Sequence, residues 1–190
     1  MKAYFTASIS GKDEYESNYK AIFSTLEKMN VEMLSDHILV TKTGDVDQIT
    51  LEREVEFYRK LNHWLNQADV VVAEVSHSST SVGHEITLAL SKNKPVIAMC
   101  VKEKKPLIFR GIKSERFQLL EYDIDDFENQ LAEALEIASE VQDTRFNFFI
   151  SPRLQSYLDW IAKNRQIPRS VFLRRLIEEH MRKNKDFHQD

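Results

Sequence analysis

Short apolar runs alternate with segments of helical spacing over the first three quarters of the chain. The runs are rich in β-branched and aromatic residues, as strands are, and they cover residues 4–9, 31–34, 70–75, 95–101 and 117–122. Between them, apolar residues recur at helical intervals in residues 13–29, 51–67, 82–91 and 126–141. Strands that alternate with helices predict an α/β fold, with a doubly wound parallel five-stranded sheet of the Rossmann or flavodoxin type.

The pattern changes at about residue 142. Apolar and polar residues partly alternate over residues 145–151, which predicts a strand. Ser151 and Pro152 are typical of an N-cap and of the first helical position, so a helix should follow them, and a second helix should cover residues 169–183. Since one strand and two short helices cannot bury a core alone, this part needs a partner copy. We therefore predict two domains, residues 1–141 and 142–190.

Composition places the chain among ordinary soluble globular proteins. Charged residues make up 29% and hydrophobic residues 42% of the 190 residues. No apolar run approaches the roughly 18 residues of a membrane span, so no membrane partner is expected. The chain starts directly with a strand-like segment and without the apolar region of a signal peptide. Cys100 is the single cysteine and cannot form an intrachain disulfide, so we expect a cytoplasmic protein.

The charge is divided unevenly along the chain. Residues 1–143 hold 16 Lys and Arg against 25 Asp and Glu, a net charge of −9. Residues 144–190 hold 10 Lys and Arg against 5 Asp and Glu, a net charge of +5. An acidic body with a basic tail suggests that the two parts have different partners.

The stretch from Asp69 to Glu85 is the main candidate for a functional site. A buried-type strand is followed by six residues, five of which are Ser or Thr, and helical spacing begins at Val82. Unpaired N–H groups and the positive dipole end make the start of such a helix a site for anions. Glu85 would lie in the first turn, at the edge where parallel sheets bind ligands. Residues 8–12 and 36–37 follow the first two strands and should converge on it.

Several motifs of the first domain occur together in one known family. They are Tyr4-Phe5 with Ser8-Ile9, Asp36-His37, Trp64-Leu65, Ala68 to Val75, Val82-Gly83-His84-Glu85, Lys94-Pro95, Arg110-Gly111 and Arg116 to Gln118. As a set, they resemble the nucleoside 2-deoxyribosyltransferase superfamily, and within it the 2′-deoxynucleoside 5′-monophosphate N-glycosidases. The resemblance covers most of residues 1–140 and implies a nucleoside or nucleoside 5′-monophosphate as substrate, with no cofactor.

The resemblance also implies roles for individual residues. In that family the glutamate corresponding to Glu85 attacks the anomeric carbon and releases the base, as a carboxylate nucleophile does in retaining glycosidases. Tyr4 would position this glutamate, Ser79 and the helix start would hold the 5′-phosphate, and His37 would border the base. The full set of expected substrate-binding residues is Ser8, Ile9, Ser10, His37, Ser79, Ser81 and Gly83.

Three positions depart from the family pattern. Leu61 stands where members usually carry an acidic residue that assists the reaction. Pro106 stands at about the position of a serine that reaches the phosphate from a neighbouring subunit, and Ser81 where glycine is common. Two hypotheses therefore stay open. The first domain either cleaves or transfers an N-glycosidic bond, or it binds a nucleotide without efficient turnover and tunes DNA binding by the tail.

The candidate residues also have ordinary structural interpretations. Glu85 could be a helix carboxylate favoured by the dipole, and Tyr4 could simply pack within the sheet. The serines could form a solvated loop. Because His37 and His84 lack metal-ligand spacing to another His, Cys or Glu, we predict no metal.

The strand and the two helices predicted within residues 144–185 resemble a ribbon-helix-helix domain of small bacterial repressors. In those dimers two strands pair into a ribbon that enters the major groove of DNA. The resemblance implies DNA as a partner, and a homodimer, or a tetramer if the first domain dimerises as well. The alternative is a tail that only dimerises. The implied DNA-binding residues are Arg145, Asn147 and Phe149 for the bases, and Arg169 and Ser170 for a phosphate.

Overall fold

The computed structural model describes residues 1–44, 50–140, 149–165 and 169–184 of the chain. These residues divide into two compact units, Met1–Asp143 and Thr144–Asp190, and each unit is described by itself. None of the helices in the described part of the chain combines the length and the apolar character that a membrane-spanning segment needs.

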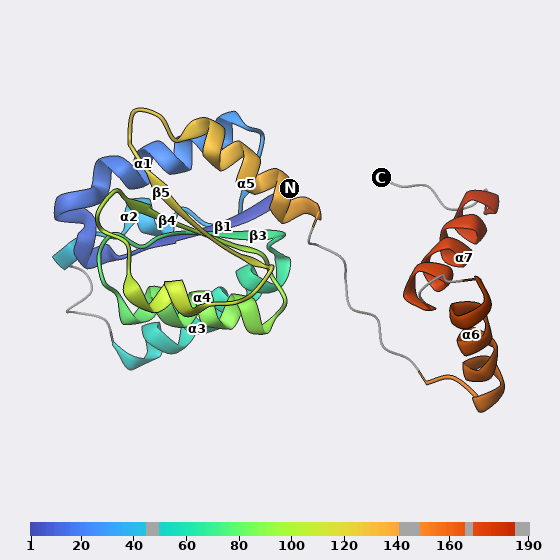
Figure 1. Ribbon diagram of the computed structural model, residues 1–190. Helices are drawn as coiled ribbons and strands as arrows, with labels where there is room; N and C mark the ends of the chain where they lie inside the picture. Colours follow the sequence, from blue (N-terminus) through green and yellow to red (C-terminus); the bar gives the residue numbers. More distant parts are fainter. Residues whose placement is uncertain (45–49, 141–148, 166–168, 185–190) are drawn as a thin grey trace. The chain divides into compact units, whose positions relative to one another are not determined.

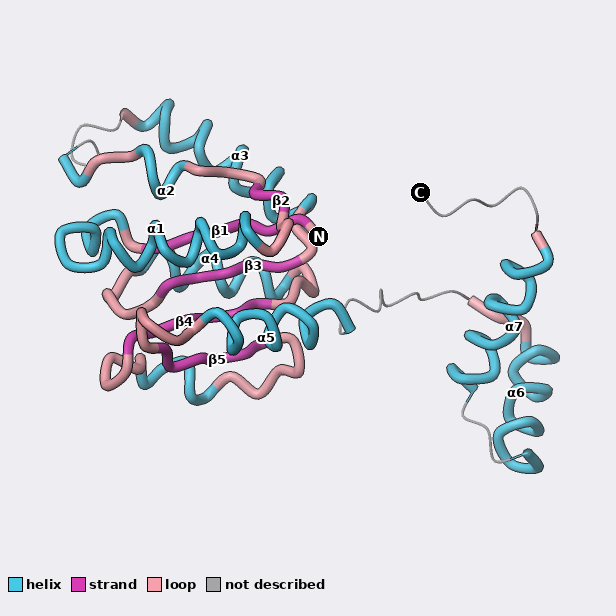
Figure 2. Tube along the Cα trace, turned by 90° about the horizontal axis from the view of Figure 1, so that it is seen from above, coloured by secondary structure: helices cyan, strands magenta, loops and turns pink. Residues whose placement is uncertain are grey.

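The first unit is built on a sheet of five parallel strands (Figure 2). The spatial order is β2-β1-β3-β4-β5. After β2 is added on one side of β1, the later strands are added on its other side, so the strand order reverses between β1 and β3. At such a switch point the loops after neighbouring strands diverge and leave room for a ligand. The strands are β1 (Lys2–Ala7), β2 (Glu32–Met33), β3 (Val70–Glu74), β4 (Val96–Val101) and β5 (Phe117–Tyr122).

Helices cover both faces of this sheet (Figure 1). Helices α1 (Lys12–Lys28) and α5 (Glu128–Glu140) lie on one face, and α3 (Leu51–Gln67) and α4 (Thr80–Ser91) lie on the other. Short helices connect these elements in the described part of the chain. They are η1 (Ile9–Gly11), α2 (His37–Val40) and η3 (Leu107–Gly111).

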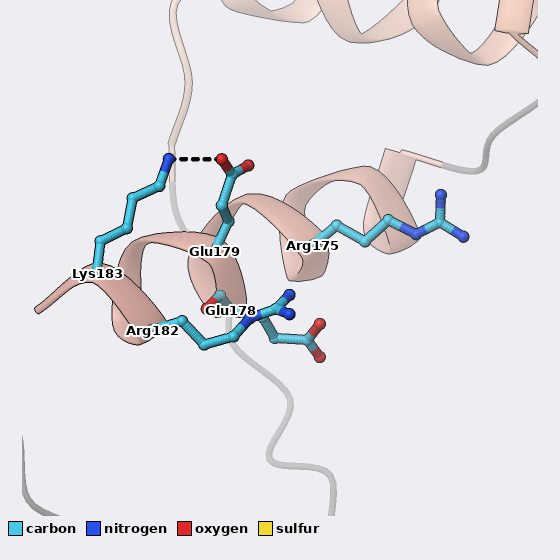
Figure 3. Close-up of a pocket in the computed structure, with 5 residues that line it drawn as sticks. All are labelled: Arg175, Glu178, Glu179, Arg182 and Lys183. Atoms are coloured by element: carbon cyan, nitrogen blue, oxygen red, sulfur yellow. Dashed lines mark hydrogen bonds and ion pairs between the residues drawn. The ribbon is translucent and has the colours of Figure 1, made fainter.

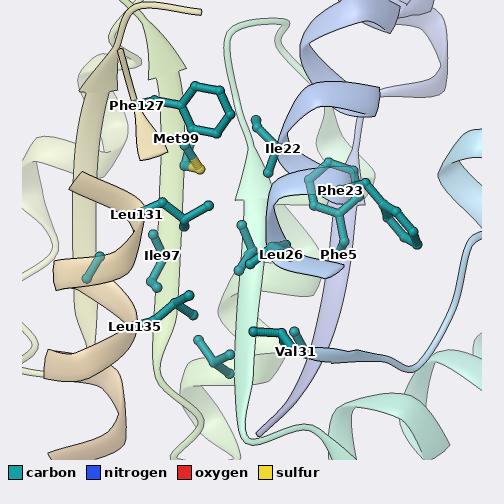
Figure 4. Packing of buried hydrophobic residues seen from close by; sticks show 14 of the residues in the cluster. Phe5, Ile22, Phe23, Leu26, Val31, Ile97, Met99, Phe127, Leu131 and Leu135 are labelled. Atoms are coloured by element: carbon teal, nitrogen blue, oxygen red, sulfur yellow. The ribbon is translucent and has the colours of Figure 1, made fainter. Parts of the chain in front are cut away.

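Alternate residues of each strand supply two separate cores. Phe5 and Val72 point to the core beneath α1 and α5, which also holds Ile22 and Leu131 (Figure 4). The next residues along the strands, Tyr4, Val71 and Ala73 among them, point to the core beneath α3 and α4. Because strand residues alternate in direction, a single step along β1 or β3 moves a side chain from one face of the molecule to the other.

The structure confirms the α/β fold with a parallel five-stranded sheet, and it corrects several boundaries. Helix α4 begins at Thr80 instead of Val82, so the predicted position of Glu85 in the first helical turn is wrong. Residues 76–81 include five hydroxyl residues that can each cap a helix, and the spacing alone does not choose among them. Helices α2 and η3 were not predicted, because one turn is too short to show a period.

The second unit contains helices α6 (Pro152–Arg165) and α7 (Arg169–Lys183), as the sequence predicts. Ser151 caps α6, where its Oγ accepts a hydrogen bond from the Leu154 N–H at 3.4 Å. The predicted strand over residues 145–151 is not shown. Residues 145–148 lie outside the described part, and Phe149 and Ile150 are not in a strand. A ribbon strand finds its hydrogen-bond partners only in a second chain, which a single copy lacks.

Candidate functional site

Strand β3 and helix α4 carry the candidate carboxylate to the carboxyl edge of the sheet. Ser79 is the N-cap of α4, and its Oγ accepts a hydrogen bond from the Val82 N–H at 3.4 Å. Glu85 lies in the second turn, on the buried side of the helix, and only 5% of it is exposed. Packing against the sheet therefore holds this side chain. The sequence predicted a place in the first turn, where the helix dipole would favour a carboxylate, and the structure does not show it there.

Glu85 is held by a phenol. The Tyr4 hydroxyl, on β1, donates a hydrogen bond to Glu85 Oε2 at 3.1 Å, and Tyr4 is fully buried. Burial raises the pKa of the Glu85 carboxyl, and the Thr6 and Tyr4 hydroxyls oppose that rise. Burial and the neighbouring Glu85 raise the pKa of Tyr4, so the phenol stays protonated and remains a donor. The pair therefore presents an oriented carboxylate that can serve as a nucleophile or a base.

An aromatic cluster, defined by Tyr4, His37, Phe57 and Trp64, lies beside this carboxylate. The His37 ring stacks on Tyr4 with a centroid distance of 5.6 Å and on Trp64 with 5.4 Å. Phe57 approaches His37 to 5.3 Å, again between ring centroids. Flat aromatic faces of this kind bind planar rings by stacking. The cluster is therefore a candidate surface for a nucleobase.

His37 takes part in the aromatic cluster as a neutral ring. Its Nδ1 lies 2.9 Å from Ser35 Oγ and its Nε2 lies 3.5 Å from the Tyr4 hydroxyl. Burial lowers the pKa of His37 to about 4, despite the opposing effect of Asp36. At neutral pH the imidazole is uncharged, so it offers stacking, one hydrogen-bond donor and one acceptor, but no positive charge.

The end of β1 folds back against the connection between β3 and α4. Ser8 is buried, its Oγ lies 2.9 Å from Ser10 Oγ, and its carbonyl accepts a hydrogen bond from the Tyr19 hydroxyl at 3.2 Å. A Cβ atom at Gly11 would lie 2.7 Å from His77 Cβ, so the two segments are in direct contact. The structure thus brings residues 8–11 next to the segment that leads into α4.

The start of α4 has the features of an anion site. The first N–H groups of a helix lack intrahelical partners, and Ser81 is exposed beside them. A Cβ atom at Gly83 would meet no described heavy atom within 4 Å, so the space beside this residue is open. Ser79 Oγ already caps the helix. Ile9, by contrast, packs its side chain against the core beneath α1 and α5.

Leu61 is buried on α3 and packs in the same core as Tyr4 and Ile86. The position therefore offers no proton donor to the site. Glu74 is the other buried carboxylate of the described residues, and it lies on the opposite face of the sheet from Glu85.

Glu74 is bound by its own network. Its carboxylate accepts hydrogen bonds from the Ser76 hydroxyl, from the Ser76 N–H at 3.3 Å and from the Tyr122 hydroxyl at 3.2 Å. Ser76 Oγ in turn accepts a hydrogen bond from the Val101 N–H at 2.8 Å. Burial raises the pKa of Glu74 to about 7, because it outweighs these three donors. The network ties the end of β3 to β4 and β5.

Sequence reasoning missed three groups near the site. Phe57 lies on the exposed face of α3, Thr6 looked like an ordinary strand residue, and the role of Glu74 was not predicted. Strand alternation does place Thr6 on the same face as Tyr4, which is a signal that could have identified it. Which partners Phe57 and Glu74 meet depends on contacts between distant segments.

Few of the predicted DNA-binding residues can be placed. Arg145 and Asn147 lie outside the described residues, as does the side chain of Ser170. Phe149 is fully exposed, and Arg169 is paired with Asp159 at 2.5 Å. Within the described part of the second unit, only two hydrophobic side chains are buried, Leu158 and Ile161. Besides Phe149, six large ones on α6 and α7 are at least 40% exposed in a single copy, and these are Leu154, Tyr157, Trp160, Leu176, Ile177 and Met181.

A surface hollow in the second unit is lined by one face of α7 alone (Figure 3). Its five lining residues are charged and of both signs, namely Arg175, Glu178, Glu179, Arg182 and Lys183. Lys183 pairs with Glu179 at 2.6 Å, and the Arg182 Nε donates to the Glu178 carbonyl at 3.4 Å. Such pairs on an exposed helix are ordinary surface contacts, so the hollow carries no functional assignment.

Comparisons with known proteins add to this geometry. No family model matches the chain. Over 130 residues it is 37% identical to a Thermofilum pendens protein provisionally named 2′-deoxynucleoside 5′-phosphate N-hydrolase 1, covering 66% of this chain and 89% of that protein. It is 29% identical over 129 residues to the 5-hydroxymethyl-dUMP N-hydrolase of Homo sapiens, covering 66% of this chain and 74% of that protein.

A solved structure is similar in fold. The CMP N-glycosidase BcmB of Clostridium botulinum matches with a TM-score of 0.51 and 14% sequence identity. The match covers 69% of this chain and 98% of that one. At this identity the likeness shows a shared fold and nothing finer.

Proposed function

Over the 66% of its length that these alignments cover, the chain belongs to the nucleoside 2-deoxyribosyltransferase and deoxynucleotide N-hydrolase family, and from this premise we propose that it hydrolyses the N-glycosidic bond of a 2′-deoxynucleoside 5′-monophosphate. The observation that carries the proposal is the buried hydrogen bond from Tyr4 to Glu85 beside the aromatic cluster. An oriented carboxylate next to a stacking surface is what cleavage of a base from a sugar requires.

In the proposed reaction, Glu85 acts as the nucleophile and Tyr4 positions it. A carboxylate oxygen of Glu85 forms a bond to the anomeric carbon while the bond from that carbon to the base nitrogen breaks. The base leaves with the bonding electron pair and takes up a proton from water. A second water molecule then cleaves the sugar ester, which restores Glu85 and gives deoxyribose 5-phosphate.

The substrate would span the two features described at the edge of the sheet. The 5′-phosphate lies at the start of α4, where unpaired N–H groups, Ser79, Ser81 and the open space beside Gly83 support an anion. Ser8 and Ser10 border it from the end of β1. The base stacks on the aromatic cluster, with His37 as its polar member.

Base release from a panel of nucleosides and 5′-monophosphates, in ribo and deoxy forms, tests the proposal. Glu85→Gln should reduce release by roughly a thousandfold or more, because an amide cannot form the covalent intermediate. Glu74→Gln is the matched control, since it neutralises the buried carboxylate on the opposite face. Release that survives in Glu85→Gln would overturn the assignment of the nucleophile.

A second candidate function is a nucleotide-sensing transcriptional regulator that binds DNA through the second unit. Leu61 favours it, because the site lacks the acidic residue expected to assist turnover. The net charge of +5 over residues 144–190 favours it as well. Affinity for DNA should then change when a deoxynucleotide is added, and Arg145→Ala with Asn147→Ala should weaken binding. A tail that only dimerises would show neither effect.

A further inference from the structure

A buried hydroxyl without a partner lies beside the proposed nucleophile. Thr6 is 1% exposed, and its Oγ1 has no hydrogen-bond partner among the described residues. Leaving a buried polar group unpaired costs free energy, so such groups are rare in native structures. A valine would fill the same volume at this strand position without that cost. The hydroxyl therefore calls for an explanation.

Strand geometry directs Thr6 toward the site. Thr6 follows Tyr4 by two residues on β1, so the two side chains leave the same face of the sheet. In the register with β3, Tyr4 lies opposite Val71 and Thr6 opposite Ala73, both of which belong to the core beneath α3 and α4. Thr6 thus lies two residues nearer than Tyr4 to the carboxyl edge of the sheet, where Glu85 lies.

The Glu85 carboxylate has room for another donor. Within the described part of the chain, only Tyr4 donates a hydrogen bond of good geometry to it, and that bond is made to Oε2. An ionised carboxylate offers about four acceptor positions. The Thr6 hydroxyl is near enough to lower the pKa of both Glu85 and Tyr4, although it completes a hydrogen bond to neither. Leu61 offers no polar contact here.

We propose that Thr6 is a positioning residue for Glu85. The Thr6 hydroxyl donates a hydrogen bond to the Glu85 carboxylate and holds it ionised and oriented for attack. This inference rests on the proposed function. Thr6 keeps its proton throughout, since it neither forms nor breaks a covalent bond. Threonine has more than one accessible rotamer, so a rotation about the Cα–Cβ bond can redirect the hydroxyl. Two donors, Tyr4 and Thr6, then fix the carboxylate where one would leave it free to turn.

Two substitutions in the full-length protein separate the hydroxyl from the methyl group. Thr6→Val is nearly isosteric and lacks the donor, whereas Thr6→Ser keeps the donor and lacks the methyl group. We expect Thr6→Val to lower kcat for base release by about tenfold to a hundredfold, with KM changed by less than about threefold. Thr6→Ser should stay within about threefold of the wild type. If Thr6→Ser falls as far as Thr6→Val, packing and not the hydroxyl is responsible, and the proposal is overturned.

The pH profile gives a readout that packing would not change. A donor to the carboxylate favours its charged form, so removing it raises the pKa of Glu85. The acidic limb of kcat/KM should move to higher pH in Thr6→Val and stay in place in Thr6→Ser. The other titratable side chains around Glu85 are Tyr4 on β1, His37 on α2 and His84 on α4, and all three are unchanged in both variants.

A titration without substrate distinguishes failure of this inference from failure of the proposed function. Carboxyl-carbon NMR of protein labelled at glutamate, with Glu85→Gln to assign the signal, reports the pKa of Glu85 directly. An increase in Thr6→Val and none in Thr6→Ser supports the hydrogen bond, even if no substrate is turned over. Equal pKa values in wild type and Thr6→Val would overturn it, even if base release by the wild type is established.

Discussion

At the scale of single residues, the same side-chain type has two different roles at the carboxyl edge of this sheet. Glu74 ends β3 and faces the core of α1 and α5, where Ser76 and Tyr122 donate to it. Glu85 approaches from α4 on the other face and is held by Tyr4. Burial raises the pKa of both carboxyls. The number and kind of donors, not the burial, separate a structural carboxylate from a candidate nucleophile.

The Glu74 carboxyl predicts a dependence of stability on pH. Its pKa rises from 4.5 to about 7 on folding, so the folded state binds the extra proton between these values. The contribution of this carboxyl to the free energy of unfolding is therefore fully present below pH 4.5 and is lost as the pH rises through 7. The loss is on the order of 3 kcal/mol. The glutamine of Glu74→Gln cannot ionise, so the variant keeps its unfolding free energy over this range while the wild type loses some. The variant should therefore become more stable relative to the wild type as the pH rises from 4.5 to 7.

Urea denaturation at several pH values measures this difference, and Tyr122→Phe supplies the control. Removing a donor from the charged form should raise the pKa of Glu74 further and extend the loss of stability to higher pH. If the difference in unfolding free energy between Glu74→Gln and wild type does not change with pH, the pKa of Glu74 is not raised by folding and the prediction is wrong.

At the scale of elements, the site depends on close contact between two connections. Gly11 ends η1, and His77 lies in the connection from β3 to α4. At Gly11 the φ angle of −84° is ordinary, so glycine is required here for space and not for backbone freedom. This contact sets how far the end of β1 lies from the start of α4, and thus the width of the proposed phosphate site.

Gly11→Ala should therefore destabilise the protein and weaken nucleotide binding. The new Cβ would lie 2.7 Å from both His77 Cβ and the Tyr19 hydroxyl, and relieving this overlap should cost about 1–3 kcal/mol. Gly111→Ala is a suitable control, because a Cβ there meets no described atom within 4 Å. Denaturation midpoints and the affinity for a deoxynucleoside 5′-monophosphate would be measured for both. Equal stability of the two variants would contradict the predicted contact.

At the scale of the whole molecule, the two units differ in how much core they contain. Both cores lie entirely within Met1–Asp143. The described part of the second unit buries two hydrophobic residues, Leu158 and Ile161, and leaves large hydrophobic side chains of α6 and α7 exposed. We therefore predict that the first unit folds by itself and that the second needs a partner to cover its helices.

Truncation tests this difference between the units. A fragment of residues 1–143 should unfold cooperatively and release base at a rate within about threefold of the full chain, because every residue of the proposed site lies within it. A fragment of residues 144–190 should gain helix content as its concentration rises, which circular dichroism would show. Loss of base release in the first fragment would mean that the second unit completes the site.

The sequence by itself determined the layer architecture of the first unit. Buried strands and amphipathic helices have different apolar periods, and their alternation leads to one parallel sheet. The same patterns pointed to the stretch that holds Glu85 and located both helices of the second unit, whereas Tyr4 and His37 entered through the family resemblance. These features depend on local spacing, which a single chain displays directly.

Only the tertiary structure decided which side chains meet. The contact of Phe57 with His37 and the burial of the Thr6 hydroxyl depend on segments far apart in the sequence. The burial that raises the pKa of Glu74 and Glu85 depends on them too. Periodicity gives the face of an element but not its distance from the neighbouring element, and site chemistry depends on that distance.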